Sequence, residues 1–132
     1  CELSILEDDT YSYMAADGAR PIATFAPERT LYLTTLTKCL LAGLRVGYLV
    51  TPEGSEATHE RALMNSGALG AMPATISVEL ASHWIESGVA DRAATAKRDE
   101  ARARQQLARK FLGEFESPTC SDSPHLWLPL AE

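Results

Sequence analysis

Short apolar runs separated by polar stretches mark the first half of the chain. Three of these runs are rich in leucine, isoleucine, valine, tyrosine and threonine, which predicts buried β-strands; they cover residues 3–7, 31–36 and 44–50. Residues 10–30 contain Gly18, Pro21 and Pro27, so we expect a loop there with at most one turn of helix. Residues 37–43 are expected to form a turn between the second and third strands.

In the second half of the chain, the pattern of apolar and polar residues is typical of helices. The apolar residues Ile76, Leu80 and Trp84 fall four apart, which predicts an amphipathic helix. A later stretch rich in Ala, Arg, Lys and Gln contains no glycine or proline before Gly113, which predicts a long exposed helix. The predicted helices cover residues 53–64, 74–87 and 90–115. A final strand is predicted over residues 125–130, and this mixture of strands and helices indicates an α/β fold.

The composition is that of an ordinary globular protein, with 45% hydrophobic and 23% charged residues. The net charge of −6 argues against the whole chain being a nucleic-acid clamp, because phosphate binding depends on Lys and Arg. No run approaches the roughly 20 apolar residues of a membrane-spanning helix, and no basic segment precedes an apolar stretch as in a secretory signal. We therefore expect a cytoplasmic protein without membrane contact. Because the sequence lacks an initial Met and opens and ends on strand-like runs, we expect it to be a segment of a longer protein.

Other side chains that could carry chemistry have simpler interpretations. The cysteines at positions 1, 39 and 120 are widely spaced, which is typical of free thiols, and we expect no catalytic role for Cys39. The histidines are scattered and form no metal-binding set. Basic residues between Arg92 and Lys110 alternate with acidic ones, which predicts a solvated helix face and not a DNA-binding surface.

Two polar motifs follow predicted strands. Asp8–Tyr11 comes directly after the first strand, whereas Thr35, Thr37 and Lys38 follow the second and Arg45 opens the third. A lysine on such a turn can reach an aldehyde while the two hydroxyls and the guanidinium converge on a phosphate. The carboxylate at the end of the earlier strand can face the opposite end of a flat aromatic cofactor.

These motifs resemble those of fold-type I pyridoxal-phosphate proteins of the aminotransferase superfamily. The resemblance is carried by Ile5–Tyr11, by Tyr32–Leu49 with its hydroxyl-x-hydroxyl-Lys and Gly-Leu-Arg-x-Gly patterns, and by His125–Leu130. Within the superfamily the chain looks most like the aminotransferase-like domain of MocR-type transcriptional regulators, a branch of the GntR family. This sequence departs from the family pattern where Thr35 and Thr37 stand in place of serines and Ala42 in place of proline. Threonine keeps the hydroxyl that phosphate binding requires.

The resemblance implies a role for each motif residue. Lys38 would form a Schiff base with pyridoxal 5′-phosphate and is the candidate catalytic residue. Asp8 would pair with the protonated pyridine nitrogen, with Asp9 as its rival, and Tyr11 would bind the phenolic oxygen, with Tyr13 as its rival. The cofactor phosphate would be held by Thr35, Thr37 and Arg45.

The resemblance also implies a domain organisation. Residues 1–73 would belong to the large cofactor-binding domain with a mostly parallel sheet, residues 74–115 would be connecting helices, and residues 116–132 would begin the small C-terminal domain. The full-length protein would be a homodimer that contacts DNA only through an N-terminal domain outside this chain. Two functions stay open: an effector-sensing domain of a transcriptional regulator, or an aminotransferase acting on an amino acid and a 2-oxo acid. A small amino compound would be the effector in the first case and the substrate in the second.

Overall fold

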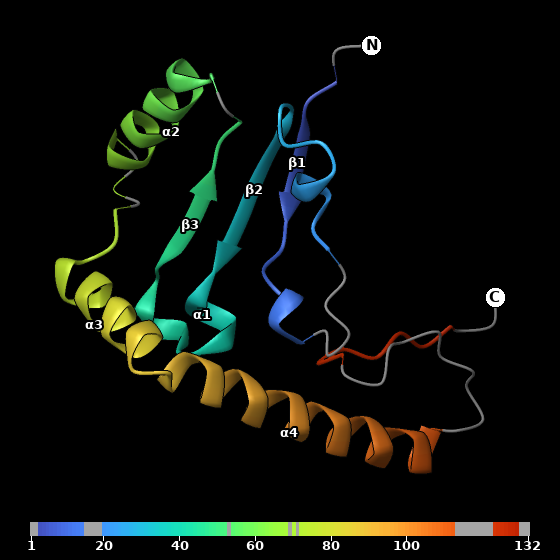
Figure 1. The fold of residues 1–132 in the computed structure, drawn as a ribbon. Coiled ribbons are helices and arrows are strands. Elements are labelled where there is room, and N and C mark those ends of the chain that lie inside the picture. Colours follow the sequence, from blue (N-terminus) through green and yellow to red (C-terminus); the bar gives the residue numbers. More distant parts are fainter. Residues whose placement is uncertain are drawn as a thin grey trace.

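The computed structural model is an α/β structure with a small mixed sheet and four α-helices (Figure 1). It describes residues 3–14, 20–52, 54–68, 70, 72–112 and 123–129. The long helix and its predecessor run across the lower end of the sheet in this view, and the segment 123–129 lies alongside the long helix (Figure 1).

The sheet contains three strands in the order β1-β2-β3. β1 and β2 are parallel, with Asp8 opposite Leu33, whereas β2 and β3 are antiparallel, with Thr35 opposite Gly47. The strands cover Ile5–Asp8, Thr30–Thr35 and Gly47–Val50. The ends of β1 and β2 and the start of β3 therefore meet at one edge of the sheet.

The expectation of a mostly parallel sheet is not met by the described strands, because only one of their two pairings is parallel. The chain between β2 and β3 is too short for the crossover that a parallel pairing requires. It reverses instead through one turn of α-helix, α1 (Leu36–Cys39), and a 3-10 turn, η3 (Ala42–Leu44). This reversal also explains why β3 begins three residues later than the predicted strand over 44–50.

Three longer helices follow, in the three regions where the sequence predicts them. They cover Glu56–Ala68 (α2), Thr75–Glu86 (α3) and Val89–Leu112 (α4). Gly88 separates the last two with a φ of 70°, a left-handed conformation that glycine adopts without strain. The helix predicted over 53–64 begins later, because the carbonyl of Ser55 accepts the first helical N–H groups, and it runs on through Gly67. Residues 113–115 of the third predicted helix lie outside the described residues.

Two predictions about irregular segments are wrong. The loop over residues 10–30 contains two 3-10 turns, η1 (Ser12–Met14) and η2 (Ile22–Thr24), where at most one turn is expected. Residues 125–129 of the predicted final strand do not form one, and Leu130 lies outside the described residues. In this segment the carbonyls of Ser123 and His125 accept hydrogen bonds from a side chain of α4 in place of a neighbouring strand.

The apolar core lies directly behind the turn that joins β2 to β3. Leu44, Val46 and Ala81 are buried together, so α3 packs against η3 and the start of β3. Partly buried side chains surround them, namely Leu36, Leu40, Leu80 and Trp84. This packing fixes the lysine-bearing turn against the helical layer.

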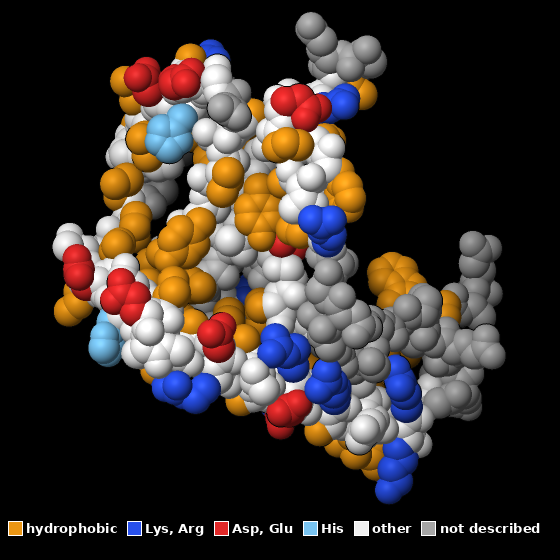
Figure 2. All heavy atoms as spheres, in the orientation of Figure 1, with side chains coloured by type: hydrophobic (Ala, Val, Ile, Leu, Met, Phe, Trp, Pro, Cys, Tyr) orange, Lys and Arg blue, Asp and Glu red, His pale blue; other side chains and the backbone are white. Residues whose placement is uncertain are grey.

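The visible surface differs between the sheet side and the long helix. Hydrophobic side chains gather over β3 and between α2 and α3, whereas basic and acidic side chains alternate along α4 (Figure 2). Two ion pairs on α4, Asp99–Arg102 and Glu100–Arg104, account for part of that alternation. Among the described residues, no helix combines the length and apolar character needed to cross a membrane.

Candidate functional site

A cleft of about 640 Å³ opens at the edge where β1 and β2 end and β3 begins. Its walls include every residue that the sequence nominates for cofactor binding, together with Thr10, Val46 and Gly47. The nominated residues are Asp8, Tyr11, Thr35, Thr37, Lys38 and Arg45. Three separate segments of the chain thus bring one set of polar side chains to one cavity.

Thr35 organises the turn that presents the lysine. It is the N-cap of α1, and its Oγ1 accepts a hydrogen bond from the Thr37 N–H at 3.1 Å. The same hydroxyl donates to the Val46 carbonyl at 2.8 Å, which ties the start of α1 to the strand opposite. The hydroxyl oxygens of Thr35 and Thr37 lie 2.9 Å apart, so both are held at the cleft wall.

The backbone of Lys38 is fixed from the side away from the cleft. Its carbonyl oxygen accepts hydrogen bonds from the Tyr13 hydroxyl at 2.9 Å and from Lys97 Nζ at 2.7 Å. Lys97 also donates to the Leu40 carbonyl at 3.3 Å, so a cation caps the C-terminal end of α1. We call this pair of donors, Tyr13 and Lys97, the carbonyl clamp. Sequence reasoning missed it because its members lie 25 and 59 positions from Lys38.

Two cations in the cleft have no counter-ion within the described part of the chain. The Lys38 and Arg45 side chains are exposed, and neither makes an ion pair or a side-chain hydrogen bond there. Arg45 also has a left-handed backbone, with φ 54° and ψ 32°, which is uncommon for a residue with a side chain. Uncompensated positive charge on a cavity wall favours an anionic ligand.

The structure distinguishes Asp8 from its neighbour. Asp8 lines the cleft, and its Oδ1 accepts hydrogen bonds from the N–H and the hydroxyl of Thr10. These bonds hold the pKa of the Asp8 carboxyl below its ordinary value, so the group stays ionised. Asp9 instead accepts a 2.6 Å hydrogen bond from the Tyr32 hydroxyl. The carboxylate available to a ligand is therefore that of Asp8.

The two tyrosines also have different surroundings. Tyr11 lines the cleft and packs edge-on against the ring of His125, with ring centroids 5.0 Å apart. Tyr13 is committed to the carbonyl clamp, and burial raises the pKa of its hydroxyl. Sequence reasoning assigned no role to Thr10, although a hydroxyl two residues after Asp8 is a signal that it could bond to the Asp8 carboxylate. The position of His125 beside Tyr11 was not predicted either.

Cys39 follows the cleft lysine but faces the interior. It is buried with its Sγ 4.0 Å from the Ala90 carbonyl oxygen, and burial raises the pKa of the thiol. A protonated, buried thiol is a poor nucleophile. Among the described residues, no group of three or more His, Cys, Asp or Glu side chains is arranged to hold a metal ion.

Comparison with known proteins identifies a distant relationship. The chain is 24% identical over 128 residues to the uncharacterized HTH-type transcriptional regulator YdeF of Bacillus subtilis (strain 168). The match covers 97% of this chain and 27% of that protein, so the chain spans about a quarter of its relative's length. No protein-family model matches the chain, and no solved structure matches it. The chain is therefore distantly related to part of an HTH-type transcriptional regulator.

Proposed function

We propose that this chain is part of a pyridoxal-phosphate-binding, aminotransferase-like domain that senses an effector in a cytoplasmic transcriptional regulator. One observation carries the proposal: the side chains of the two sequence motifs line a single cleft at the end of two parallel strands. Ligands of α/β proteins commonly bind at the carboxyl ends of such strands. The cleft volume of about 640 Å³ is in the range of small-molecule and cofactor sites.

The phosphate would lie among the residues of the turn between β2 and β3. Thr35 and Thr37 offer hydroxyls 2.9 Å apart, and Arg45 offers a guanidinium without another described partner. Guanidinium groups bind phosphate through paired, charge-assisted hydrogen bonds. The positive charge of Arg45 would balance part of the phosphate dianion.

The opposite end of the cofactor would lie near β1. When bound, pyridoxal phosphate supplies an aldehyde carbon and an electron-accepting ring. Lys38 is the one lysine among the described cleft residues, and its exposed amine is the group to attach to the aldehyde. Asp8 would hold a proton on the ring nitrogen, because both described hydrogen bonds use Oδ1 and leave Oδ2 for a cationic N–H. Tyr11 would donate its hydroxyl to the ring oxygen.

The relationship to a transcriptional regulator favours a sensing role over catalysis. The complete protein would be a homodimer that contacts DNA through another domain, and a small amino compound bound in the cleft would be its effector. The discriminating experiment incubates the complete protein and pyridoxal phosphate with amino acids and 2-oxo acids. A regulator should change its DNA affinity without catalytic turnover, whereas sustained amino transfer would indicate an aminotransferase.

Cofactor binding is tested by titrating the complete protein with pyridoxal phosphate and recording the visible absorbance of the bound cofactor. We expect the wild-type protein to bind the cofactor saturably. Lys38→Ala should abolish the covalent attachment of the cofactor. Lys110→Ala removes an exposed lysine on α4 and is the matched control, which should bind as the wild type does. Absence of the bound-cofactor absorbance in the wild type, or its persistence in Lys38→Ala, would refute the proposal.

A further inference from the structure

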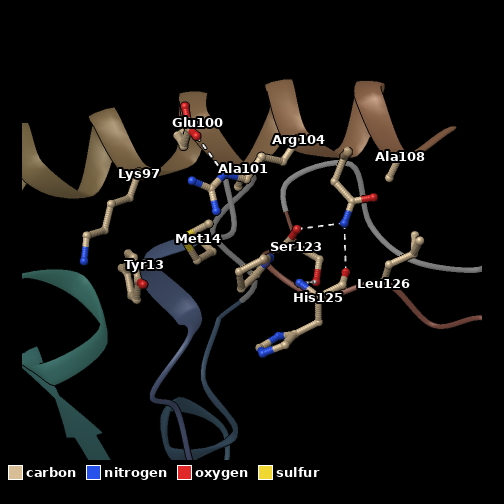
Figure 3. Close-up of a pocket in the computed structure, with 12 residues that line it drawn as sticks. Tyr13, Met14, Lys97, Glu100, Ala101, Arg104, Ala108, Ser123, His125 and Leu126 are labelled. Carbon is tan, nitrogen blue, oxygen red and sulfur yellow. Dashed lines mark hydrogen bonds and ion pairs between the residues drawn. The ribbon is translucent and has the colours of Figure 1, made fainter. Parts of the chain in front are cut away.

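A second pocket, of about 440 Å³, lies on the other side of the carbonyl clamp (Figure 3). It is enclosed by α4, by η1 and by the segment 123–126. Tyr13 and Lys97 of the clamp are part of its wall, but the cleft residues nominated for the cofactor are not. The proposed cofactor function therefore leaves this cavity unexplained.

One wall of the pocket carries an unsatisfied polar atom. The Gln105 side chain is only 5% exposed, and its Nε2 donates to the Ser123 and His125 carbonyls, both at 2.8 Å. Because two carbonyl acceptors require the NH2 group, these bonds fix which way the amide faces. Its Oε1 is buried without a hydrogen-bond partner among the described residues. A buried acceptor in this state is destabilising unless a ligand or a water molecule donates to it.

Cationic groups lie on the same face of α4. Lys97 and Arg104 of α4 both line the pocket. Figure 3 shows the Lys97 side chain running from α4 past Tyr13 toward the α1 turn, and the Arg104 guanidinium beside Glu100. Lys97 donates to neutral carbonyls, and Arg104 meets Glu100 through Nε at 2.7 Å. Two cations thus face one carboxylate, which leaves positive charge for an anionic group on a ligand.

The remaining wall is largely apolar. It includes Met14 from η1, Ala101 and Ala108 from α4, and Leu126 from the C-terminal segment. We propose that this pocket binds a small organic acid with an apolar body and a hydroxyl at the end opposite its carboxylate. The carboxylate would pair with Lys97 and Arg104, and the body would contact the apolar wall. The hydroxyl would donate to Gln105 Oε1, which is buried and would become reachable through a small shift of its side chain on binding. The volume accommodates a molecule with one ring.

Three probes separate these contacts: 4-hydroxybenzoate, benzoate without the hydroxyl, and phenol without the carboxylate. Each is titrated into the complete protein by calorimetry, with and without pyridoxal phosphate. None of the probes carries an amine, so the cofactor aldehyde does not provide an alternative binding partner. We expect 4-hydroxybenzoate to bind about tenfold more tightly than either of the others, since each lost contact removes roughly one hydrogen bond or ion pair. Equal affinities, or no binding of 4-hydroxybenzoate, would overturn the proposal.

Two substitutions of alanine by leucine on α4 test whether 4-hydroxybenzoate binds in this pocket. Ala108→Leu places a larger side chain in the pocket and should abolish binding of 4-hydroxybenzoate. Ala103→Leu makes the same change at an exposed position of the same helix and should leave the affinity unchanged. Because the readout does not depend on the cofactor, failure here is distinguishable from failure of the proposed function. Unchanged affinity in Ala108→Leu would place the binding elsewhere and refute this assignment.

Discussion

The two ends of Lys38 have opposite environments. Its amine faces a cleft in which Lys38 and Arg45 make no ion pair with a described residue, whereas its carbonyl is held by Tyr13 and Lys97. On the cleft side, the hydroxyls and cations are close in sequence, since Thr35, Thr37, Lys38 and Arg45 fall within one turn region, and the end of β1 adds Asp8. The α4 side is built by contacts between distant segments, because α4 packs against both α1 and η1.

The contrast teaches which groups support the structure and which remain available for chemistry. Hydrogen bonds to the Lys38 carbonyl limit how α1 can move, so the backbone that carries the exposed amine is held in place. The Lys38 and Arg45 side chains make no ion pair with a described residue, so they would meet a ligand without first breaking one. Substitutions on the two sides should therefore have separable effects, on cofactor affinity at the cleft and on stability behind it.

Arg45→Met should produce the largest change on the cleft side. Removing the guanidinium should weaken pyridoxal-phosphate binding by about 10- to 100-fold, because hydrogen bonds to charged groups contribute roughly 1.5–3 kcal/mol. Titration of the complete protein measures this affinity. Arg61→Met removes an exposed arginine on α2 and should retain wild-type affinity. Equal affinities for the two variants would show that Arg45 does not bind the phosphate.

The neighbouring aspartates should separate function from stability. Asp9→Asn weakens the bond to the Tyr32 hydroxyl and should lower the free energy of unfolding by about 1 kcal/mol. Asp8→Asn should leave that free energy close to the wild-type value while lowering cofactor affinity. Denaturant unfolding and cofactor titration of both variants provide the comparison. The reverse pattern would assign the ring-nitrogen partner to Asp9.

Lys97→Met tests whether the carbonyl clamp stabilises α1. Loss of the ammonium leaves the Lys38 and Leu40 carbonyls with fewer donors and should cost about 1 kcal/mol, the typical net contribution of a hydrogen bond. Hydrogen exchange of the Leu40 amide, which bonds to the Leu36 carbonyl, should accelerate about fivefold in consequence. Lys110→Met is the control on the exposed side of α4. If exchange at Leu40 were the same in both variants, the clamp would have no energetic role.

The smallest expected effect is a pH dependence at Tyr32. Burial, together with the hydrogen bond to Asp9, raises the pKa of the Tyr32 hydroxyl above its ordinary value of 10.0. Its contribution to stability is therefore fully present below about pH 10 and is lost as the pH rises through the folded-state pKa. Tyr32→Phe should reduce the alkaline loss of stability by less than about 1 kcal/mol, as measured by denaturant unfolding at several pH values. Tyr48→Phe, at an exposed position of β3, should keep the wild-type profile; an identical change in both variants would contradict this assignment.

Local patterns in the sequence predict much of the fold. The four-residue spacing of Ile76, Leu80 and Trp84 predicts α3, and the absence of glycine and proline predicts α4. The final strand is wrongly predicted from Leu126–Leu128, because an apolar run does not reveal whether a neighbouring strand is present to pair with it. There the carbonyls of the segment are instead satisfied by Gln105.

In the candidate site, too, some features follow from local sequence patterns and others depend on contacts between distant residues. Hydroxyls, lysine and arginine at short spacing nominate the cleft residues, and the structure brings all of them to one cavity. The choice between Asp8 and Asp9 depends on Tyr32, which lies 23 positions away. Contacts across that distance are set by tertiary packing, and no local pattern reports them.

The most direct measurement is borohydride reduction of the complete protein with pyridoxal phosphate, followed by mass-spectrometric mapping of the modified residue. Reduction makes the attachment of the cofactor permanent, so the labelled lysine identifies the amine that binds it. The account predicts a single label on Lys38, which Arg45→Met reduces and Lys38→Ala eliminates. A label on Lys97 or Lys110, or no label at saturating cofactor, would contradict the assignment of this cleft as the cofactor site.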